Sequence, residues 1–270
     1  MPVQPVLLAV AHGSRDPRHA KTLRALAGRV RARRPGLRVE IAFLDFDVPS
    51  VQGVLTALAS EVRRAGPGEA RVAREVVAVP LLLSRAFHAR ADIPALLRQS
   101  PPELRIEQAA VLGPAPPLSR ALERRLYEAG LTPGDKSSTG LVLASAGTSD
   151  PEANAVIAEI AREWRRTGWC AVRPAFASLP ADEPPAVGGS GAVGAGTAWA
   201  VRRLRALGCA RVAVACYVLA PGFLTDRIAR GAARADLVAP VLGDAPEVVE
   251  TVLHRFDQAC SRPRVTAFVP

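Results

Sequence analysis

Two histidines lie where an apolar run ends. His12 directly follows residues 6–11 (VLLAVA), and His88 comes shortly after residues 74–84 (REVVAVPLLLS). Neutral imidazoles bind divalent transition metals and accept protons near neutral pH. The two rings could share one ion, or one ring could hold the ion while the other accepts a proton. A single histidine at a strand end is more often structural, but two at matching ends favour function.

The chain contains a second copy of this pattern. Residues 6–17 read VLLAVAHGSRDP and residues 141–151 read LVLASAGTSDP, so Ala146 stands opposite His12. Residues 76–93 align without a gap with residues 211–228, which places Phe223 opposite His88. Duplication followed by loss of one site explains both differences. Asp16 and Asp150 precede proline in both copies, which favours a helix-start role for them.

Alternating strands and helices must position the histidines. In the first half we expect strands at 6–11, 39–46, 74–84 and 104–112, and helices at 19–33, 51–64, 93–98 and 118–130. The second half repeats the order with one helix fewer: strands at 141–145, 171–177, 211–219 and 237–240, and helices at 151–167, 196–207 and 246–260. This order predicts an α/β protein of two similar domains, each a parallel, doubly wound sheet flanked by helices.

The polar segment 132–140 (TPGDKSSTG) separates the copies, so we predict domains at 1–133 and 134–270. Ligands of open parallel sheets bind beyond the carboxyl ends of the strands. Both His12 and His88 are therefore expected at one edge. His19 and His254 fall inside predicted helices among polar neighbours and are interpreted as surface residues. The Gly-rich segment 179–196 is interpreted as a mobile loop that could act as a flap over the site.

Composition excludes several other classes of protein. No apolar run approaches the ~20 residues of a membrane span, and the start MPVQP does not resemble a signal peptide, so a cytoplasmic location is expected. Four cysteines, all in the second half, lack metal-site spacing and are expected to be buried thiols: Cys170, Cys209, Cys216 and Cys260. The net charge of +10 could attract nucleic acid or a small polyanion, but a solvated Arg-rich surface is favoured over a nucleic-acid site, since aromatic residues are only 4%.

Three segments together resemble the class II chelatases that insert cobalt or iron into sirohydrochlorin. They are HGSRDP, AFLDFDVPS and PLLLSRAFHARADIP, in the family's order within residues 5–130, and residues 140–260 resemble a degenerate second copy. The resemblance implies that His12 and His88 bind the metal and that His12 accepts a proton. It also implies that the tetrapyrrole is contacted by Asp45, Leu83, Ser84, Arg85, Ala86 and Phe87. Asp45 replaces the family's usual Glu, and residues 85–87 replace its Gly-rich turn.

The chemistry suits these residue types. Imidazole binds a divalent ion without the tenacity of several thiolates, so the ion can be released into the ring. Arg15, Arg85 and Arg90 are candidates for pairing with substrate carboxylates, and Ser14 is grouped with the substrate-binding residues. The expected ligands are an anionic tetrapyrrole and Fe²⁺, Co²⁺ or Ni²⁺ as substrate, with no tightly bound cofactor, no nucleic acid and no membrane, in a monomer or homodimer.

Two other functions remain open. A tetrapyrrole or metal carrier could use the same cleft without turnover. A phosphoryl-transfer enzyme of the histidine phosphatase type is less favoured, because those proteins need an arginine directly before the histidine and this chain has Ala11. No GxSxG elbow is present, which disfavours a serine hydrolase.

Overall fold

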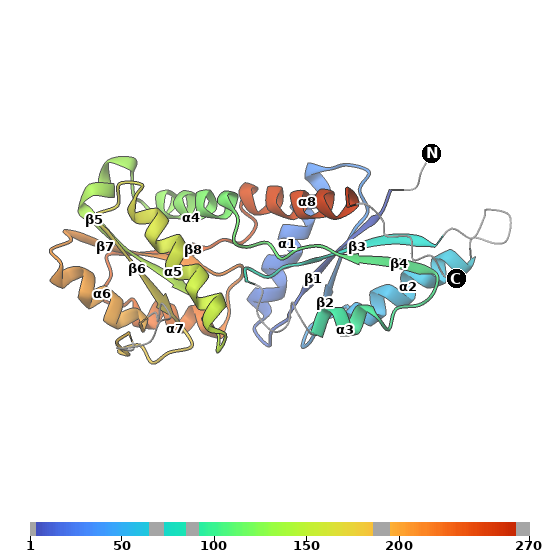
Figure 1. The fold of residues 1–270 in the computed structure, drawn as a ribbon, viewed down its shortest axis with the longest axis horizontal. Helices are drawn as coiled ribbons and strands as arrows, with labels where there is room; N and C mark the ends of the chain where they lie inside the picture. Colours follow the sequence, from blue (N-terminus) through green and yellow to red (C-terminus); the bar gives the residue numbers. More distant parts are fainter. Residues whose placement is uncertain (1–3, 65–72, 85–91, 186–194, 263–270) are drawn as a thin grey trace.

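The computed structural model describes residues 4–64, 73–84, 92–185 and 195–262 (Figure 1). Two four-stranded parallel sheets organise it, with strand orders β2-β1-β3-β4 and β6-β5-β7-β8. The first sheet contains β1 (Val6–Ala11), β2 (Val39–Phe43), β3 (Arg74–Pro80) and β4 (Leu104–Gln108). The second contains β5 (Thr139–Ser145), β6 (Ala171–Phe176), β7 (Arg211–Tyr217) and β8 (Leu237–Val241). The predicted fold class is confirmed.

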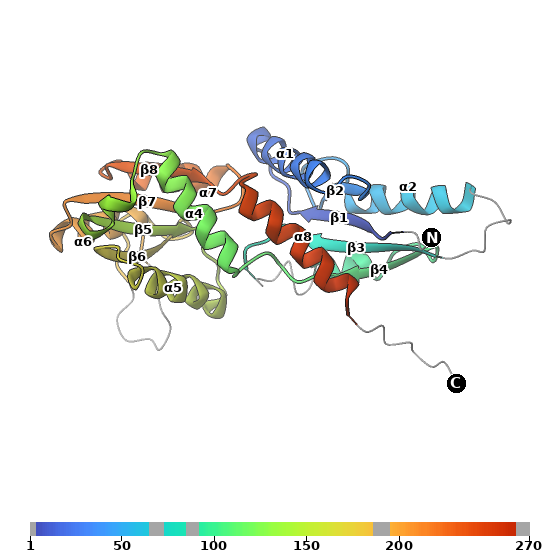
Figure 2. The same ribbon diagram turned by 90° about the horizontal axis from the view of Figure 1, so that it is seen from above.

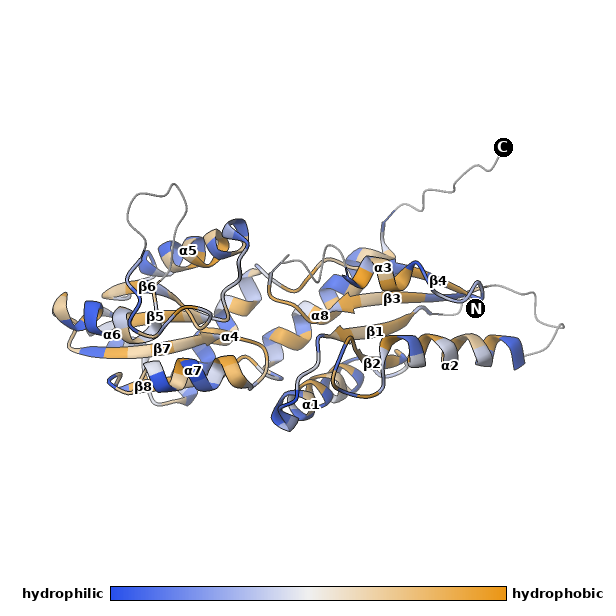
Figure 3. Ribbon diagram, turned by 90° about the horizontal axis from the view of Figure 1, so that it is seen from below, coloured by the Kyte–Doolittle hydropathy of each residue, from blue (hydrophilic) through white to orange (hydrophobic). Residues whose placement is uncertain are grey.

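Helices cover both faces of each sheet, which is why the central strands are apolar at almost every position. All six residues of β1 and all seven of β5 are buried. Figure 3 shows this contrast, with predominantly hydrophobic strands between helices of mixed colour. The helices of the first half are α1 (Pro17–Arg33), α2 (Val51–Arg64), α3 (Ile93–Leu97) and α4 (Pro116–Glu128). Those of the second half are α5 (Pro151–Arg165), α6 (Thr197–Ala206), α7 (Phe223–Gly231) and α8 (Pro246–Cys260).

The last helix of each half packs against the other half. Figures 1 and 2 show α4 beside β7 and β8 of the second sheet, and α8 beside α1 and β3 of the first. One continuous core therefore runs through both halves, from Leu23 and Phe43 to Trp164 and Phe256. Two smaller cores lie on the opposite faces, one under α2 and α3 and one under α6 and α7.

The predicted boundary between residues 133 and 134 lies in a short 3-10 helix, η2 (Pro133–Ser138). This boundary stays a prediction. Because α4 packs on the second sheet and α8 on the first, each packed unit contains a helix from the other half of the chain. The last helix of each half covers apolar surface of the other half. We therefore expect the two halves to unfold together.

Several predicted elements change in extent. The second and third strands end at Phe43 and Pro80, earlier than predicted. After Phe43 the chain turns to contact the His12 loop, where the Asp45 amide donates to the His12 carbonyl, and after Pro80 it lines the cleft. The sequence analysis missed α7, whose start at Gly222 has the Thr225 hydroxyl accepting from the Gly222 backbone amide at 2.8 Å. A Pro-Gly pair before a short helix obscured the periodicity.

The prediction of buried thiols is right for two cysteines and wrong for two. Cys209 and Cys216 are buried, whereas Cys170 and Cys260 are exposed. Cys170 directly precedes β6, and Cys260 is the last residue of α8, so neither lies in a sheet core. Within the described ranges, none of the helices is both long enough and apolar enough to cross a membrane. The predicted flap rests partly on residues 186–194, which lie outside the described residues.

Candidate functional site

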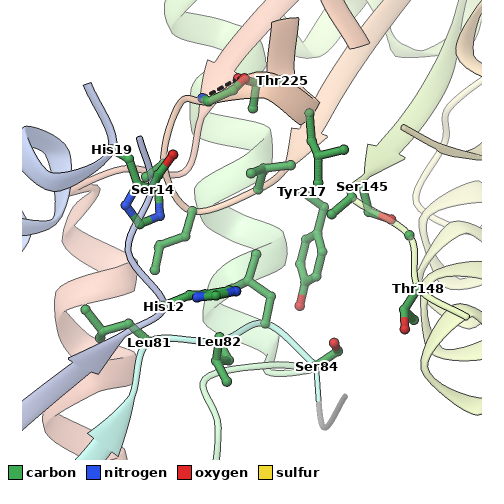
Figure 4. Close-up of a pocket in the computed structure, with 18 of the residues that line it drawn as sticks. His12, Ser14, His19, Leu81, Leu82, Ser84, Ser145, Thr148, Tyr217 and Thr225 are labelled. Carbon is green, nitrogen blue, oxygen red and sulfur yellow. Dashed lines mark hydrogen bonds between the residues drawn. The ribbon is translucent and has the colours of Figure 1, made fainter. Parts of the chain in front are cut away.

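A cleft of about 460 Å³ lies between the two halves. Its walls come from the segments that follow β1 and β3 in the first half and β5 and β7 in the second (Figure 4). In the first sheet, β1 connects to β2 on one side and β3 connects to β4 on the other; β5 and β7 do the same in the second sheet. Each of these central pairs is a topological switch point, where parallel sheets bind ligands. The exchange of helices holds the two switch points face to face. The cleft therefore needs both halves.

His12 is the first residue after β1 and lines this cleft, as predicted. Its backbone carbonyl accepts a hydrogen bond from the Asp45 amide at 2.9 Å. Gly13 follows with φ +93°, and a Cβ built there would lie 1.8 Å from the carbonyl oxygen of Asp45. Only glycine fits this turn, because both its φ and its contact with the second loop exclude a side chain. The turn thus fixes where the His12 imidazole projects.

Hydrogen bonds to the carboxylates of Asp47 and Asp16 hold the loop after His12 in place. The Ser14 amide donates to Oδ2 of Asp47 at 3.0 Å, and the Asp16 amide donates to the Ser14 hydroxyl at 3.1 Å. The Asp16 carboxylate accepts from the Arg18 amide at 2.9 Å and caps α1, and Asp150 caps α5 in the same way. The predicted helix-start role of both aspartates is confirmed. The sequence analysis did not single out Asp47.

His19 is not a surface residue, contrary to the sequence prediction. It is half-buried, lines the cleft, and its Nδ1 is buried without a hydrogen-bond partner in the described structure. Burial lowers the pKa of His19, and the nearby His12 shifts that pKa in the same direction, while Asp47 opposes them. His19 is therefore a neutral imidazole near His12. Its place in the first turn of the helix that follows β1 was the signal, because such turns border the ligand crevice. His254 is exposed, as predicted.

The segment after β3 forms part of the cleft lining. Leu83 and Ser84 line the cleft, as does Leu81, whose amide donates to the Val10 carbonyl at 2.8 Å. The remaining predicted residues of this motif lie outside the described residues: Arg85, Ala86, Phe87, His88 and Arg90. That His12 and His88 face each other across the cleft therefore stays a prediction.

Two predicted substrate contacts lie outside the cleft lining. Asp45 is exposed, and its Oδ1 accepts from the Phe46 amide at 2.8 Å. Arg15 is exposed, with its guanidinium carbon 5.2 Å from the centroid of the Phe46 ring. Within the described residues, the lining contains neither Asp, Glu, Lys nor Arg. The described walls are apolar with scattered neutral polar groups.

The second half contributes hydroxyls that sequence reasoning missed. Ser145 and Tyr217 end β5 and β7, face each other in register, and line the cleft. Both hydroxyl oxygens are buried without a hydrogen-bond partner in the parts of the chain described. Burial raises the pKa of Tyr217 well above its ordinary value, so it stays a neutral phenol. The first copy has apolar Ala11 and Leu82 at these positions, which was the available signal.

Two close approaches join the halves beside the cleft. Nη2 of Arg18 on α1 lies 2.7 Å from Oδ2 of Asp226 on α7. A Cβ built on Gly222 would lie 3.9 Å from the Ser14 hydroxyl, so the start of α7 approaches the turn that carries His12. These contacts place the start of α7, where the second copy lacks a histidine, close to the turn that carries His12 in the first copy.

The described residues do not by themselves form a multidentate metal centre. No group of three or more His, Cys, Asp and Glu side chains among them could hold an ion. The cleft instead offers a transition metal the imidazole of His12, with His19 nearby, beside apolar walls suited to a flat organic ligand. Such a site can hold an ion weakly and pass it on.

Comparisons with known proteins agree with this geometry. A sirohydrochlorin cobaltochelatase from Priestia megaterium is 28% identical over 233 residues, which are 82% of this chain and 66% of that protein. The chain thus spans slightly less than two thirds of this relative's length. SirB from Bacillus subtilis with Fe³⁺ has the same fold, with a TM-score of 0.74, 22% identity and 96% of both chains covered. The cobalt complex of the sirohydrochlorin chelatase SirB from Bacillus subtilis subspecies spizizenii gives a TM-score of 0.68 at 21% identity, over 96% of this chain and 97% of that one.

The family model of CbiX matches the chain twice. The matches cover residues 6–129 and residues 140–259, which correspond to the two copies recognised in the sequence. Each match includes one sheet together with the helix that packs on the other sheet. The chain therefore belongs to the CbiX family, with two copies of the family domain in one polypeptide.

Proposed function

We propose that this protein is a metallochelatase that inserts a divalent metal, Fe²⁺ or Co²⁺, into sirohydrochlorin. The observation that carries the proposal is the position of His12, at a cleft that both sheets build from their switch points. Family membership and the cobaltochelatase relative supply the reaction and its substrate. The product serves sirohaem or cobalamin synthesis.

In this reaction the ion enters the ring while two pyrrole nitrogens lose their protons. His12 and His88 bind the incoming ion. As the ion leaves for the ring, the His12 imidazole accepts one of the protons and the other passes to water. A neutral imidazole suits both tasks, because it is both a metal ligand and a general base. The ion is a substrate, and no resident cofactor is required.

The macrocycle lies in the cleft between the two halves. Its apolar faces meet the leucines after β3 and β7, and Leu83 and Ser84 belong to that lining. The other predicted contacts, Asp45, Arg15, Arg85, Ala86, Phe87 and Arg90, act from the rim or from the segment that follows Ser84. Ser14, which also lines the cleft, holds the turn beside His12.

One chain contains both walls of the cleft, which supports a monomer as the active unit. The cytoplasm is the proposed location, since the four free cysteines suit a reducing compartment. A homodimer is the alternative that size-exclusion chromatography with light scattering separates from a monomer.

The test is metal insertion by purified protein, followed by the change in the visible spectrum of sirohydrochlorin after addition of Co²⁺ or Fe²⁺. His12→Ala and His88→Ala are expected to reduce the rate to its spontaneous value. His254→Ala is the matched control, because His254 is exposed on α8 and outside the cleft lining. Undiminished insertion by His12→Ala would contradict the proposal. Wild-type protein that binds the pigment and leaves the spontaneous rate unchanged is a carrier.

A further inference from the structure

Phe223 is an exposed aromatic residue on the wall of the cleft. It is the first residue of α7, lines the cleft, and leaves 68% of its surface in contact with solvent. It stands opposite His88 in the alignment of the two copies. Large aromatic side chains usually bury their rings in cores or interfaces, so an exposed ring that borders a cleft indicates a ligand surface.

Arg227 lies one turn further along α7 and holds a fixed position over this ring. Its guanidinium carbon is 5.9 Å from the centroid of Phe223, and Nη2 donates to the Leu179 carbonyl at 3.0 Å. In the described structure the guanidinium makes no ion pair with a carboxylate, whereas the adjacent Asp226 pairs with Arg18. Arg227 therefore places an uncompensated positive charge beside an exposed aromatic face.

Phe223 lines the cleft opposite residues of the first half, and Arg227 lies beside its ring. Gly222, which directly precedes Phe223, approaches the Ser14 hydroxyl, and Ser14 belongs to the turn after His12. The described lining contains no Asp, Glu, Lys or Arg, and Arg227 lies outside it, beside Phe223, as a cation within reach of the cleft edge. A flat ligand between the halves would meet His12 on one side and the Phe223 ring on the other.

We propose that Phe223 and Arg227 form a substrate-binding subsite of the second half. The ring of Phe223 packs against one face of the macrocycle, and the Arg227 guanidinium pairs with a carboxylate at its edge. The inference rests on the proposed function and names its substrate contacts. It also gives the second copy a role: the position that holds a metal-binding histidine in the first copy holds an aromatic contact here.

The experiment measures the Kd of sirohydrochlorin without metal, from its visible absorption change on binding, together with KM and kcat of insertion. Phe223→Ala is expected to raise Kd and KM about tenfold, the size of a lost aromatic contact, with kcat little changed. Phe223→Tyr should bind as wild type does. Arg227→Gln is expected to raise Kd about fivefold, more at low than at high salt, and Arg227→Lys should recover part of that loss.

Two control variants match the changes. Leu207→Ala removes another exposed apolar side chain of the second half, 47% exposed and outside the cleft lining. Arg230→Gln removes an exposed arginine from the same helix as Arg227. Both should bind sirohydrochlorin as wild type does, and Co²⁺ binding without pigment should be equal in all variants.

Wild-type affinity in Phe223→Ala and Arg227→Gln would overturn the inference and leave the chelatase function intact. Equal losses in the two control variants would also overturn it, since the effect would then be general. If the wild-type protein neither binds nor metallates sirohydrochlorin, the proposed function itself fails.

Discussion

Arg124 donates to both carboxylate oxygens of Glu247: Nε lies 2.9 Å from Oε1 and 3.1 Å from Oε2, and Nη2 lies 2.7 Å from Oε1. The pair joins α4 of the first half to α8 of the second, the two helices that exchange sheets. Glu247 is buried, although it carries a charge. Buried carboxylates are stable only when paired, so this contact helps to hold the helix exchange together.

The Glu247–Arg124 pair predicts a pH-dependent stability. Burial alone would raise the pKa of Glu247, but hydrogen bonds from Arg124 and from its own backbone outweigh it and leave the pKa below its ordinary value. A lowered folded-state pKa contributes stability above the unfolded value of ~4.3, and this stability is lost as the pH falls through the folded pKa. Glu247→Gln is therefore expected to be less stable than wild type at pH 7, with the difference shrinking below pH ~4.

Urea denaturation at pH 7, 5 and 3.5 checks this prediction. Glu250→Gln is the control, because Glu250 meets Arg120 only at 3.8 Å and both side chains are more than half exposed. It should stay close to wild type at every pH. A difference for Glu247→Gln that does not change with pH would show that the carboxylate charge is not what stabilises the helix pair.

Gly13→Ala is expected to destabilise the protein and abolish metal insertion. The new Cβ would collide with the Asp45 carbonyl at a positive φ, at a cost of about 3 kcal/mol or more. The turn that carries His12 must then move. Gly28→Ala is the matched control, since nothing lies within 4 Å of a Cβ there and Gly28 is inside α1. It should stabilise by about 0.5–1 kcal/mol. Thermal unfolding and insertion rates measure both, and a stable, active Gly13→Ala would refute the role of the turn.

Tyr217→Phe is expected to stabilise the protein by about 1 kcal/mol, because it removes a buried hydroxyl that has no hydrogen-bond partner in the described structure. Thr139→Val provides a comparison away from the cleft, since the Thr139 hydroxyl is also buried without a partner and lies at the opposite end of β5. Guanidinium denaturation measures the two changes. Loss of stability in Tyr217→Phe alone would indicate that an ordered water serves the phenol.

Asp150→Ala is expected to lower the free energy of unfolding by about 1 kcal/mol through loss of the α5 cap. Asp150→Asn should retain most of the stability, because the amide oxygen can accept from the Glu152 backbone amide. Chemical denaturation of the two variants is the measurement. If both variants lost the same stability, the charge of Asp150 near the helix terminus, and not its acceptor oxygen, would be responsible.

Much of the fold could be predicted because its signals are local. Continuous apolar runs such as residues 6–11 specify buried parallel strands, and Asp-Pro pairs specify where the next helices begin. The repeated order of these signals revealed the two copies. The end of the first strand at His12 follows from the same pattern, which is why its place at the cleft could be predicted.

Other features depend on which surfaces meet. The apolar faces of α4 and α8 show that each helix is buried, but periodicity cannot tell which sheet covers it, so the exchange was not foreseen. His19 looked like a surface residue because its sequence neighbours are polar, while the groups that bury it come from distant segments. The positions of Ser145, Tyr217 and Phe223 at the cleft could be recognised only from the arrangement of the two halves around it.

The sequence by itself determined the two copies, their strands and helices, and the histidine that one copy retains, because these depend on residues close together in the chain. The tertiary structure decided that the halves exchange their last helices and share one cleft. That outcome follows from the burial of apolar faces between segments far apart in the chain, which no local pattern records.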